Sequence, residues 1–273
     1  MSYQPPVQDL MFCIEHLSHW DKVSKLSAHT DTELPDIAAA LEGFAQFCAE
    51  QIAPLSYVGD AQSAHFDKGR VTLPKGHAQA YAQFVEMGWQ ALPHLVDYGG
   101  VGLPRAAGAA AVEMLNAADM SFGLCPLLTD GAIEALLLTG SDEQRSTYLG
   151  PLISGRWSGT MNLTEPQAGS DLGRVATKAM RREDGSYGIT GTKIYCARSL
   201  LHCMRKVLTA VTSTTLDLVH RVIGFGYQII CSDTILWKHR NTDTRTAIDL
   251  SIHNDIRLTN LYQQFLCNID GKS

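Results

Sequence analysis

The sequence lacks several features that mark whole classes of protein. It has no basic excess, because 22 Lys and Arg stand against 28 Asp and Glu, and this argues against a nucleic-acid-binding protein. It contains no run of about 18 apolar residues, so we expect no transmembrane helix. Its first ten residues do not combine a basic stretch with an apolar block, so we expect no signal peptide.

Paired cysteines and clustered metal ligands are also missing. The seven cysteines are scattered without a C-x-x-C pair, which favours a reducing compartment and predicts a cytoplasmic protein. His16 and His19 stand three residues apart, but a zinc site needs three or four ligands and none is near in the sequence. We therefore expect no metal.

Glutamate and proline are absent from the C-terminal part of the chain. All ten prolines lie at or before Pro166, and all glutamates lie at or before Glu183. Residues 1–196 carry 13 Lys and Arg against 22 Asp and Glu, a net charge of −9, whereas residues 197–273 carry nine against six, a net charge of +3. This contrast predicts two parts with different origins or constraints, although a helix-and-strand tail that happens to lack both residues remains an alternative.

The first part of the chain has the apolar spacing of helices. Apolar residues recur at steps of three and four over 36–51, which predicts an amphipathic helix that ends at Pro54. The same pattern predicts further helices over 7–17, 76–87, 106–118, 122–138 and 141–152. We expect Pro126 to interrupt one of these, and Ser141 and Gln144 to form a capping box at the start of the last.

Near residue 158 the apolar period changes from 3.6 to two, which predicts strands. We expect these strands over 158–163, 176–182, 187–190 and 191–195. The predicted fold class is therefore α+β, with an N-terminal all-helical domain followed by a partial antiparallel β-domain. We divide the chain into an N-terminal extension, a helical domain, the start of the β-domain and a divergent tail of unknown fold, over 1–34, 35–156, 157–196 and 197–273.

The loop after the first of these strands carries the strongest chemical pattern. Residues 164–171, T-E-P-Q-A-G-S-D, offer hydroxyl groups at Thr164 and Ser170 and are expected to offer exposed backbone N–H groups around Ala168 and Gly169. Such a loop can surround an oxyanion, a phosphate or a ring edge without a side-chain charge. The carboxylate of Glu165 either takes part in acid–base chemistry or holds the loop, and we favour the second role.

This loop, followed by G-x-K-x-aromatic at 191–195, resembles the signature of the acyl-CoA dehydrogenase family. The run Y-G-G-V-G-L-P at 98–104 is similar to a loop of that family. The opening Y-Q-P-P at 3–6 and M-N-L at 161–163 resemble a longer subfamily that contains 3-methylmercaptopropionyl-CoA dehydrogenase. The resemblance covers residues 1–196 and implies a helical domain, a β-domain and a C-terminal helix bundle, the last of which we expect to be missing here.

The resemblance implies FAD as the cofactor, an acyl-CoA as the substrate, and electron transfer to an electron-transfer flavoprotein. It also implies a homo-oligomer. Thr164 would hydrogen-bond the pyrimidine edge of the flavin, Tyr195 would lie beside the isoalloxazine ring, and Ser170 would contact phosphate or the pantetheine portion of the substrate. Carried over by position, the cofactor-binding residues would be Met161, Asn162, Leu163, Thr164, Gly169, Ser170 and Tyr195.

Two departures from the family pattern change what we expect of the activity. Cys196 and Ala197 follow Tyr195, where the family usually has Ile and then a hydroxyl-bearing residue that faces the flavin. The family's catalytic Glu lies in the C-terminal helices, and no glutamate follows Glu183, so we assign no catalytic residue. We expect a truncated or frame-shifted dehydrogenase that lacks its base. The alternative is a non-catalytic remnant or interaction module that does not retain FAD.

Overall fold

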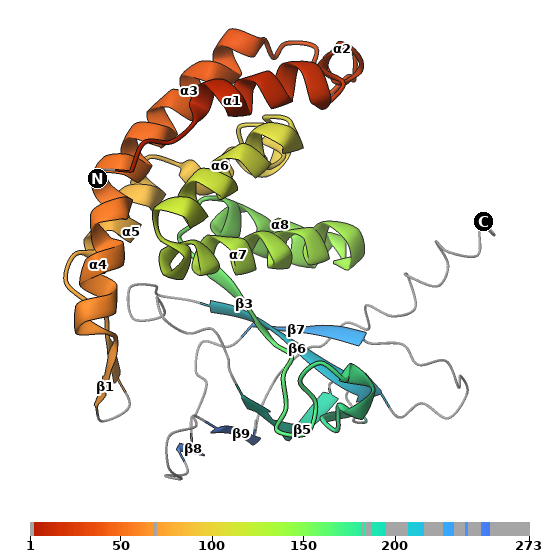
Figure 1. The fold of residues 1–273 in the computed structure, drawn as a ribbon. Coiled ribbons are helices and arrows are strands. Elements are labelled where there is room, and N and C mark those ends of the chain that lie inside the picture. Colours follow the sequence, from red (N-terminus) through yellow and green to blue (C-terminus); the bar gives the residue numbers. More distant parts are fainter. Residues whose placement is uncertain are drawn as a thin grey trace. The chain divides into compact units, whose positions relative to one another are not determined.

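The computed structural model describes residues 3–67, 70–181, 183, 187–194, 207–215, 226–231, 238–239 and 247–251 (Figure 1). Within these residues a helical part comes first and a β-sheet follows, which confirms the predicted α+β class. The chain forms two compact units. Among the described residues, the first comprises those up to Leu127 and Ser146–Trp157, and the second comprises Leu128–Arg145 and the described residues from Ser158 onward. The domain boundaries drawn from the sequence stay predictions.

The first unit is mainly helical, and it contains the helices expected over 7–17, 76–87 and 106–118. Its elements are α1 (Val7–Phe12), α2 (Trp20–Val23), α3 (Leu34–Phe47), α4 (Ala53–Gln62), the hairpin strands β1 (His65–Asp67) and β2 (Arg70–Thr72), α5 (His77–Glu86) and α6 (Arg105–Ala118). A π-helical turn over Cys13–Leu17 continues α1. Two further helices, α7 (Met120–Thr139) and α8 (Asp142–Ile153), belong partly to each unit.

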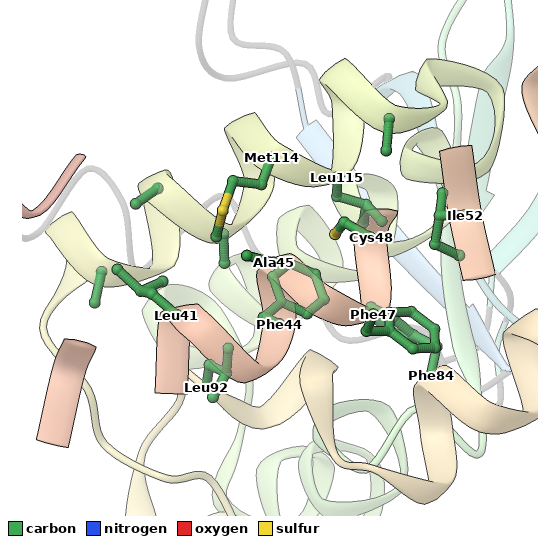
Figure 2. Close-up of a cluster of buried hydrophobic side chains, with 14 of the residues drawn as sticks. Leu41, Phe44, Ala45, Phe47, Cys48, Ile52, Phe84, Leu92, Met114 and Leu115 are labelled. Carbon is green, nitrogen blue, oxygen red and sulfur yellow. The ribbon is translucent and has the colours of Figure 1, made fainter. Parts of the chain in front are cut away.

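Aromatic side chains fill the core of this helical unit. The ring centroid of Phe44 lies 5.0 Å from that of Trp89, and Phe47 lies 6.4 Å from Phe84. Figure 2 shows Phe44 and Phe47 on one helix, with Met114 of a neighbouring helix on the same cluster. These apolar positions are buried as their spacing predicts, so α3 owes its place to packing rather than to propensity alone.

The helix expected over 36–51 is present, but it does not end at Pro54. A π-helical turn over Cys48–Ile52 follows α3, and α4 then begins at Ala53 with Pro54 in its first turn. The first-turn N–H groups of a helix have no intrahelical partner, so a proline there removes no hydrogen bond. The predicted end was wrong because Pro54 lies in the first turn of α4, where no backbone donor is needed.

The helix α7 runs without interruption through Pro126, so that expected break was also wrong. By length and composition α7 could cross a membrane, with a mean hydropathy of 1.4 over Met120–Leu138. Core helices of soluble proteins meet the same criterion, and Phe122, Ile133 and Leu136 of α7 are buried. The expectation of no membrane span therefore remains a prediction.

The second unit is built on a sheet with the strand order β3-β6-β4-β5-β9-β8, and β7 pairs with β6 (Figure 1). Its strands are β3 (Ser158–Asn162), β4 (Lys178–Arg181), β5 (Tyr187–Ile194), β6 (Val207–Thr215), β7 (Gly226–Cys231), β8 (Lys238–His239) and β9 (Ala247–Ser251). Two strand pairs, β3 with β6 and β4 with β6, are parallel, whereas the remaining pairs are antiparallel. The sheet is therefore mixed rather than purely antiparallel as expected.

Two further predictions from the sequence, a pair of strands and a capping box, can be compared with the structure here. The strands expected over 187–190 and 191–195 are one strand, β5, because the backbone stays extended through Gly191. The predicted capping box at the start of α8 is confirmed. The Ser141 hydroxyl accepts the Gln144 N–H at 3.2 Å, and the Gln144 side chain accepts the Ser141 N–H at 2.9 Å.

Candidate cofactor-binding bend

Residues 164–171, called the bend below, leave β3 and lead to β4 through a 3₁₀ turn at Leu172–Arg174. Their own backbone closes the bend, because the N–H groups of Glu165 and Ala168 each donate to the other residue's carbonyl at 3.0 Å. The bend therefore has a fixed path before any ligand is considered.

The Glu165 carboxylate anchors the bend from within. The side chain is 2% exposed and accepts hydrogen bonds from four donors. These are the backbone N–H groups of Ala176 at 2.7 Å and Thr177 at 3.0 Å, the Gln167 amide at 2.5 Å, and the Lys193 ammonium at 2.8 Å. The prediction that this carboxylate holds the loop is confirmed.

Lys193 joins the bend to strand β5. Its side chain is completely buried, and besides the Glu165 carboxylate its ammonium donates to the carbonyl of Leu163 at 3.1 Å. The next residue of β5, Ile194, donates its N–H to the carbonyl of Thr164 at 2.9 Å. Two consecutive residues of one strand therefore hold Leu163 and the first two residues of the bend.

Gly191 allows β5 to come this close. A Cβ atom at this position would lie 2.1 Å from the hydroxyl oxygen and 2.7 Å from the Cα of Thr177, closer than real contacts allow. Residues 191 and 193 share one face of the strand, because side chains alternate along it. The missing side chain at Gly191 lets that face approach Thr177, and the Lys193 side chain then reaches Glu165.

A second glycine anchors the strand that enters the bend. A Cβ at Gly159 in β3 would lie 2.4 Å from the Cβ of Ala132, so only glycine fits this contact with α7. The Gly159 N–H also donates to the hydroxyl of Thr129 at 3.1 Å. The helix α7 therefore holds β3 from one side.

The anchoring hydrogen bonds determine the charge of Glu165. Burial raises the pKa of the Glu165 carboxyl, but hydrogen bonds from Lys193, Thr177 and Ala176 outweigh burial and lower it to about 2. The group is therefore a carboxylate at neutral pH, with its oxygens already engaged. Such a group is a poor proton acceptor, which argues against the acid–base role.

The exposed part of the bend lies beyond this anchor. Leu163 and Thr164 are half-buried, whereas Gly169 and Ser170 are exposed. The expectation of an exposed N–H at Ala168 was wrong, because Ala168 is buried and its N–H donates to the Glu165 carbonyl. A Cβ at Gly169 would meet no atom within 4 Å, so the backbone there has open space beside it. The structure thus brings one predicted hydroxyl group to the anchored start of the bend and the other to its exposed end.

The remaining predicted cofactor residues are only partly described. Met161 and Asn162 lie in β3, where their backbones pair with Ala210 and Val211 of β6. Tyr195 lies outside the described residues. The cofactor roles of all these positions stay predictions. Among the described residues, no group of three or more metal-binding side chains occurs.

A comparison with known families identifies the helical part. Residues 35–156 match the model described as the N-terminal domain of acyl-CoA dehydrogenase. The chain belongs to the acyl-CoA dehydrogenase family. The resemblance that the bend and the G-x-K run suggested is therefore confirmed.

Two curated members of the acyl-CoA dehydrogenase family illustrate the likeness. The 3-methylmercaptopropionyl-CoA dehydrogenase of Ruegeria pomeroyi is 54% identical over 230 residues, covering 84% of this chain and 39% of that protein. The butyryl-CoA dehydrogenase of Syntrophomonas wolfei is 30% identical over 235 residues, covering 84% of this chain and 38% of that protein. This chain spans under two-fifths of the length of both relatives. Matches of this length do not fit within residues 1–196, so the likeness continues past the point where we expected it to stop.

Solved structures agree with the fold. An acyl-CoA dehydrogenase of Bacillus anthracis complexed with FAD aligns with a TM-score of 0.62 at 18% identity, over 84% of this chain and 38% of that one. The butyryl-CoA dehydrogenase of Megasphaera elsdenii aligns with a TM-score of 0.62 at 19% identity, over 79% of this chain and 55% of that one. At such low identity these likenesses establish the fold alone.

Sequence reasoning missed how the two family motifs act on each other. It used T-E-P-x-A-G-S-D and G-x-K as separate marks of the acyl-CoA dehydrogenase family and gave Lys193 no role. A buried lysine needs an anionic partner, and Glu165 was the carboxylate already assigned to hold the loop. The sequence placed both residues in the two motifs but carried no signal that they meet, because their contact spans 28 positions.

Proposed function

We propose that the bend forms one wall of a site for FAD and for an acyl-CoA thioester, and that the chain takes part in α,β-dehydrogenation of that thioester. The observation that carries this proposal is the bend itself. It is fixed from within by Glu165 and Lys193, and it leaves Gly169 and Ser170 exposed. The names of the relatives support the reaction class, and the FAD complex of the Bacillus anthracis protein supports the cofactor.

The residues of the bend fit such a cofactor. The Thr164 hydroxyl can donate to a carbonyl on the pyrimidine edge of a flavin, with its backbone already held by Ile194. The open space beside Gly169 admits a phosphate or pantetheine group close to the backbone, and the exposed Ser170 hydroxyl can donate to it. Met161, Asn162, Leu163 and Tyr195 complete the proposed wall. The chemistry that bound FAD supplies is the acceptance of a hydride.

The proposal assigns no catalytic base to the bend. Its buried carboxylate, Glu165, is held by four donors and has a pKa of about 2, so it does not accept a proton from the substrate at neutral pH. The bend residues bind and orient the cofactor and the substrate. In this proposal the base that removes the substrate proton lies outside the bend. We therefore propose that the chain by itself lacks efficient dehydrogenase activity.

Three further features belong to the proposal through the family. Electrons would pass to an electron-transfer flavoprotein, the protein would assemble as a homo-oligomer, and it would act in the cytoplasm. The odd, dispersed cysteines support the last of these.

FAD binding tests the proposal directly. The purified chain is titrated with FAD, followed by flavin fluorescence, and then checked for co-elution of flavin absorbance during gel filtration. Thr164→Val and Ser170→Ala should each weaken binding about fivefold, as expected for the loss of one hydrogen bond. Thr72→Val, which changes an exposed threonine of β2, is the matched control and should leave binding unchanged.

Three outcomes would count against parts of the proposal. A folded chain that binds no FAD overturns the cofactor assignment and favours a non-catalytic interaction module. Equal binding in all three variants removes the bend from the site. Rapid dye reduction with an acyl-CoA shows that the chain carries an efficient base of its own.

A further inference from the structure

We propose that Glu165 and Lys193 are positioning residues that set the orientation of Thr164 toward the cofactor without touching the cofactor themselves. This inference rests on the proposed function. It is suggested by the contacts of one ammonium group on both sides of Thr164. The Lys193 ammonium donates to the Leu163 carbonyl at 3.1 Å and to the Glu165 carboxylate at 2.8 Å.

These contacts leave Thr164 little freedom. Its own carbonyl accepts the Ile194 N–H at 2.9 Å, so this residue and both of its neighbours are held by the same strand. With the backbone fixed on both sides, the side chain leaves the chain in one direction. Ile194 also directly precedes Tyr195, so the anchor joins two residues of the proposed cofactor wall.

The chemistry of the pair favours a positioning role over a purely stabilising one. Removing two charges from water carries a penalty that can cancel their attraction, so apolar side chains of similar volume often give equal stability. What apolar side chains cannot provide is a set of directed hydrogen bonds. Here the pair forms five such bonds. Three join it to backbone groups, one joins it to the Gln167 side chain, and one joins Glu165 to Lys193. Together these bonds fix the position of the backbone around Thr164, and an apolar replacement would lose this effect.

The double variant Glu165→Gln/Lys193→Met separates geometry from stability. It removes both charges together, so no uncompensated charge stays buried. We expect a melting temperature near that of the wild type and an FAD dissociation constant about fivefold higher, the same loss as for Thr164→Val, because a misdirected hydroxyl contributes no more to binding than a missing one. Two controls accompany it. Lys178→Met makes the same lysine-to-methionine change at an exposed position on β4. Ile133→Val removes one buried methyl group from α7 and so lowers stability without touching the bend. Both variants should retain wild-type affinity for FAD.

Hydrogen exchange of the wild-type chain tests the same role without a variant. If the pair positions the bend in advance, the Ala168 and Ile194 amides exchange slowly without FAD, and adding FAD slows them no further. Exchange that is rapid until FAD binds would mean that the cofactor orders the bend, and the positioning role would be overturned.

The outcomes distinguish the two proposals. A folded double variant with wild-type affinity overturns the positioning role alone. A wild-type chain that binds no FAD, although both amides are protected, overturns the proposed function and with it this role. Weak binding confined to the double variant, with slow exchange in the wild type, supports both.

Discussion

A Cβ atom at Gly191 would lie 2.1 Å from the hydroxyl oxygen of Thr177, so β5 approaches the start of β4 where no side chain intervenes. This approach brings the buried Lys193 side chain to the Glu165 carboxylate, at 2.8 Å. The bend thus depends on a missing side chain as much as on the charged ones.

Gly191→Ala should therefore destabilise the second unit by about 1–3 kcal/mol, the usual cost of forcing atoms into a packed site. Urea denaturation at neutral pH measures the change. Gly131→Ala is the matched control, because a Cβ there meets nothing within 4 Å and the residue lies within a helix. Removing a glycine from a helix should raise stability by about 0.5–1 kcal/mol. If Gly191→Ala causes no loss of stability, or no greater loss than Gly131→Ala, the close approach of β5 to Thr177 is contradicted.

The stability of the chain should fall in acid partly because of Glu165. The pKa of its carboxyl is lowered from 4.5 to about 2 in the folded state, so the contribution is full above about pH 4.5 and is lost as the pH falls toward 2. A shift of this size corresponds to about 3 kcal/mol for a group that is almost fully buried. Unfolding free energies between pH 2 and 7 should fall more steeply for the wild type than for Glu165→Gln. Parallel curves would show that the carboxylate is not the source.

The order of elements could be predicted from the sequence, because it depends on local apolar spacing. The period of three and four places α3, α5 and α6, and the change of period places β3. The helix end at Pro54 was misjudged because the rule that proline ends a helix ignores where a new helix starts. No such start accounts for Pro126, which lies inside α7. At Pro54 a π-helical turn ends and α4 begins, so the ring lies where no donor is required.

Strand direction and partners could not be predicted in the same way. Alternation marks a strand but does not name its neighbour, and the neighbour of both β3 and β4 is β6, from the part of the chain whose composition differs. The bend was recognised from its motif, whereas its anchor needed a contact between residues 28 positions apart. Such long-range contacts arise from packing and are not encoded in local spacing.

The N-terminal segment should contribute to the core of the helical unit. Ile14 is buried within the same cluster as Phe44, and the Tyr3 hydroxyl donates to the Met114 carbonyl at 3.2 Å. Ile14→Ala should cost about 2–4 kcal/mol, as large-to-small changes in cores do. Phe12→Ala, two residues away but exposed, is the control and should cost well under half as much. Thermal unfolding of both variants gives the comparison, and similar losses would place the segment outside the core.

Asp119 should stabilise α7 as its N-cap. One carboxylate oxygen accepts the N–H groups of Ser121 at 2.9 Å and Phe122 at 3.2 Å, and the other lies 3.7 Å from Nε2 of the buried His77. Asp119→Ala removes both contacts and should cost about 1–2 kcal/mol. Asp119→Asn keeps an acceptor for the cap and should cost less, because asparagine caps helices about as well as aspartate. Denaturation of both variants at neutral pH decides between the two contacts. If Asn costs as much as Ala, the negative charge facing His77, and not the cap, is what stabilises this junction.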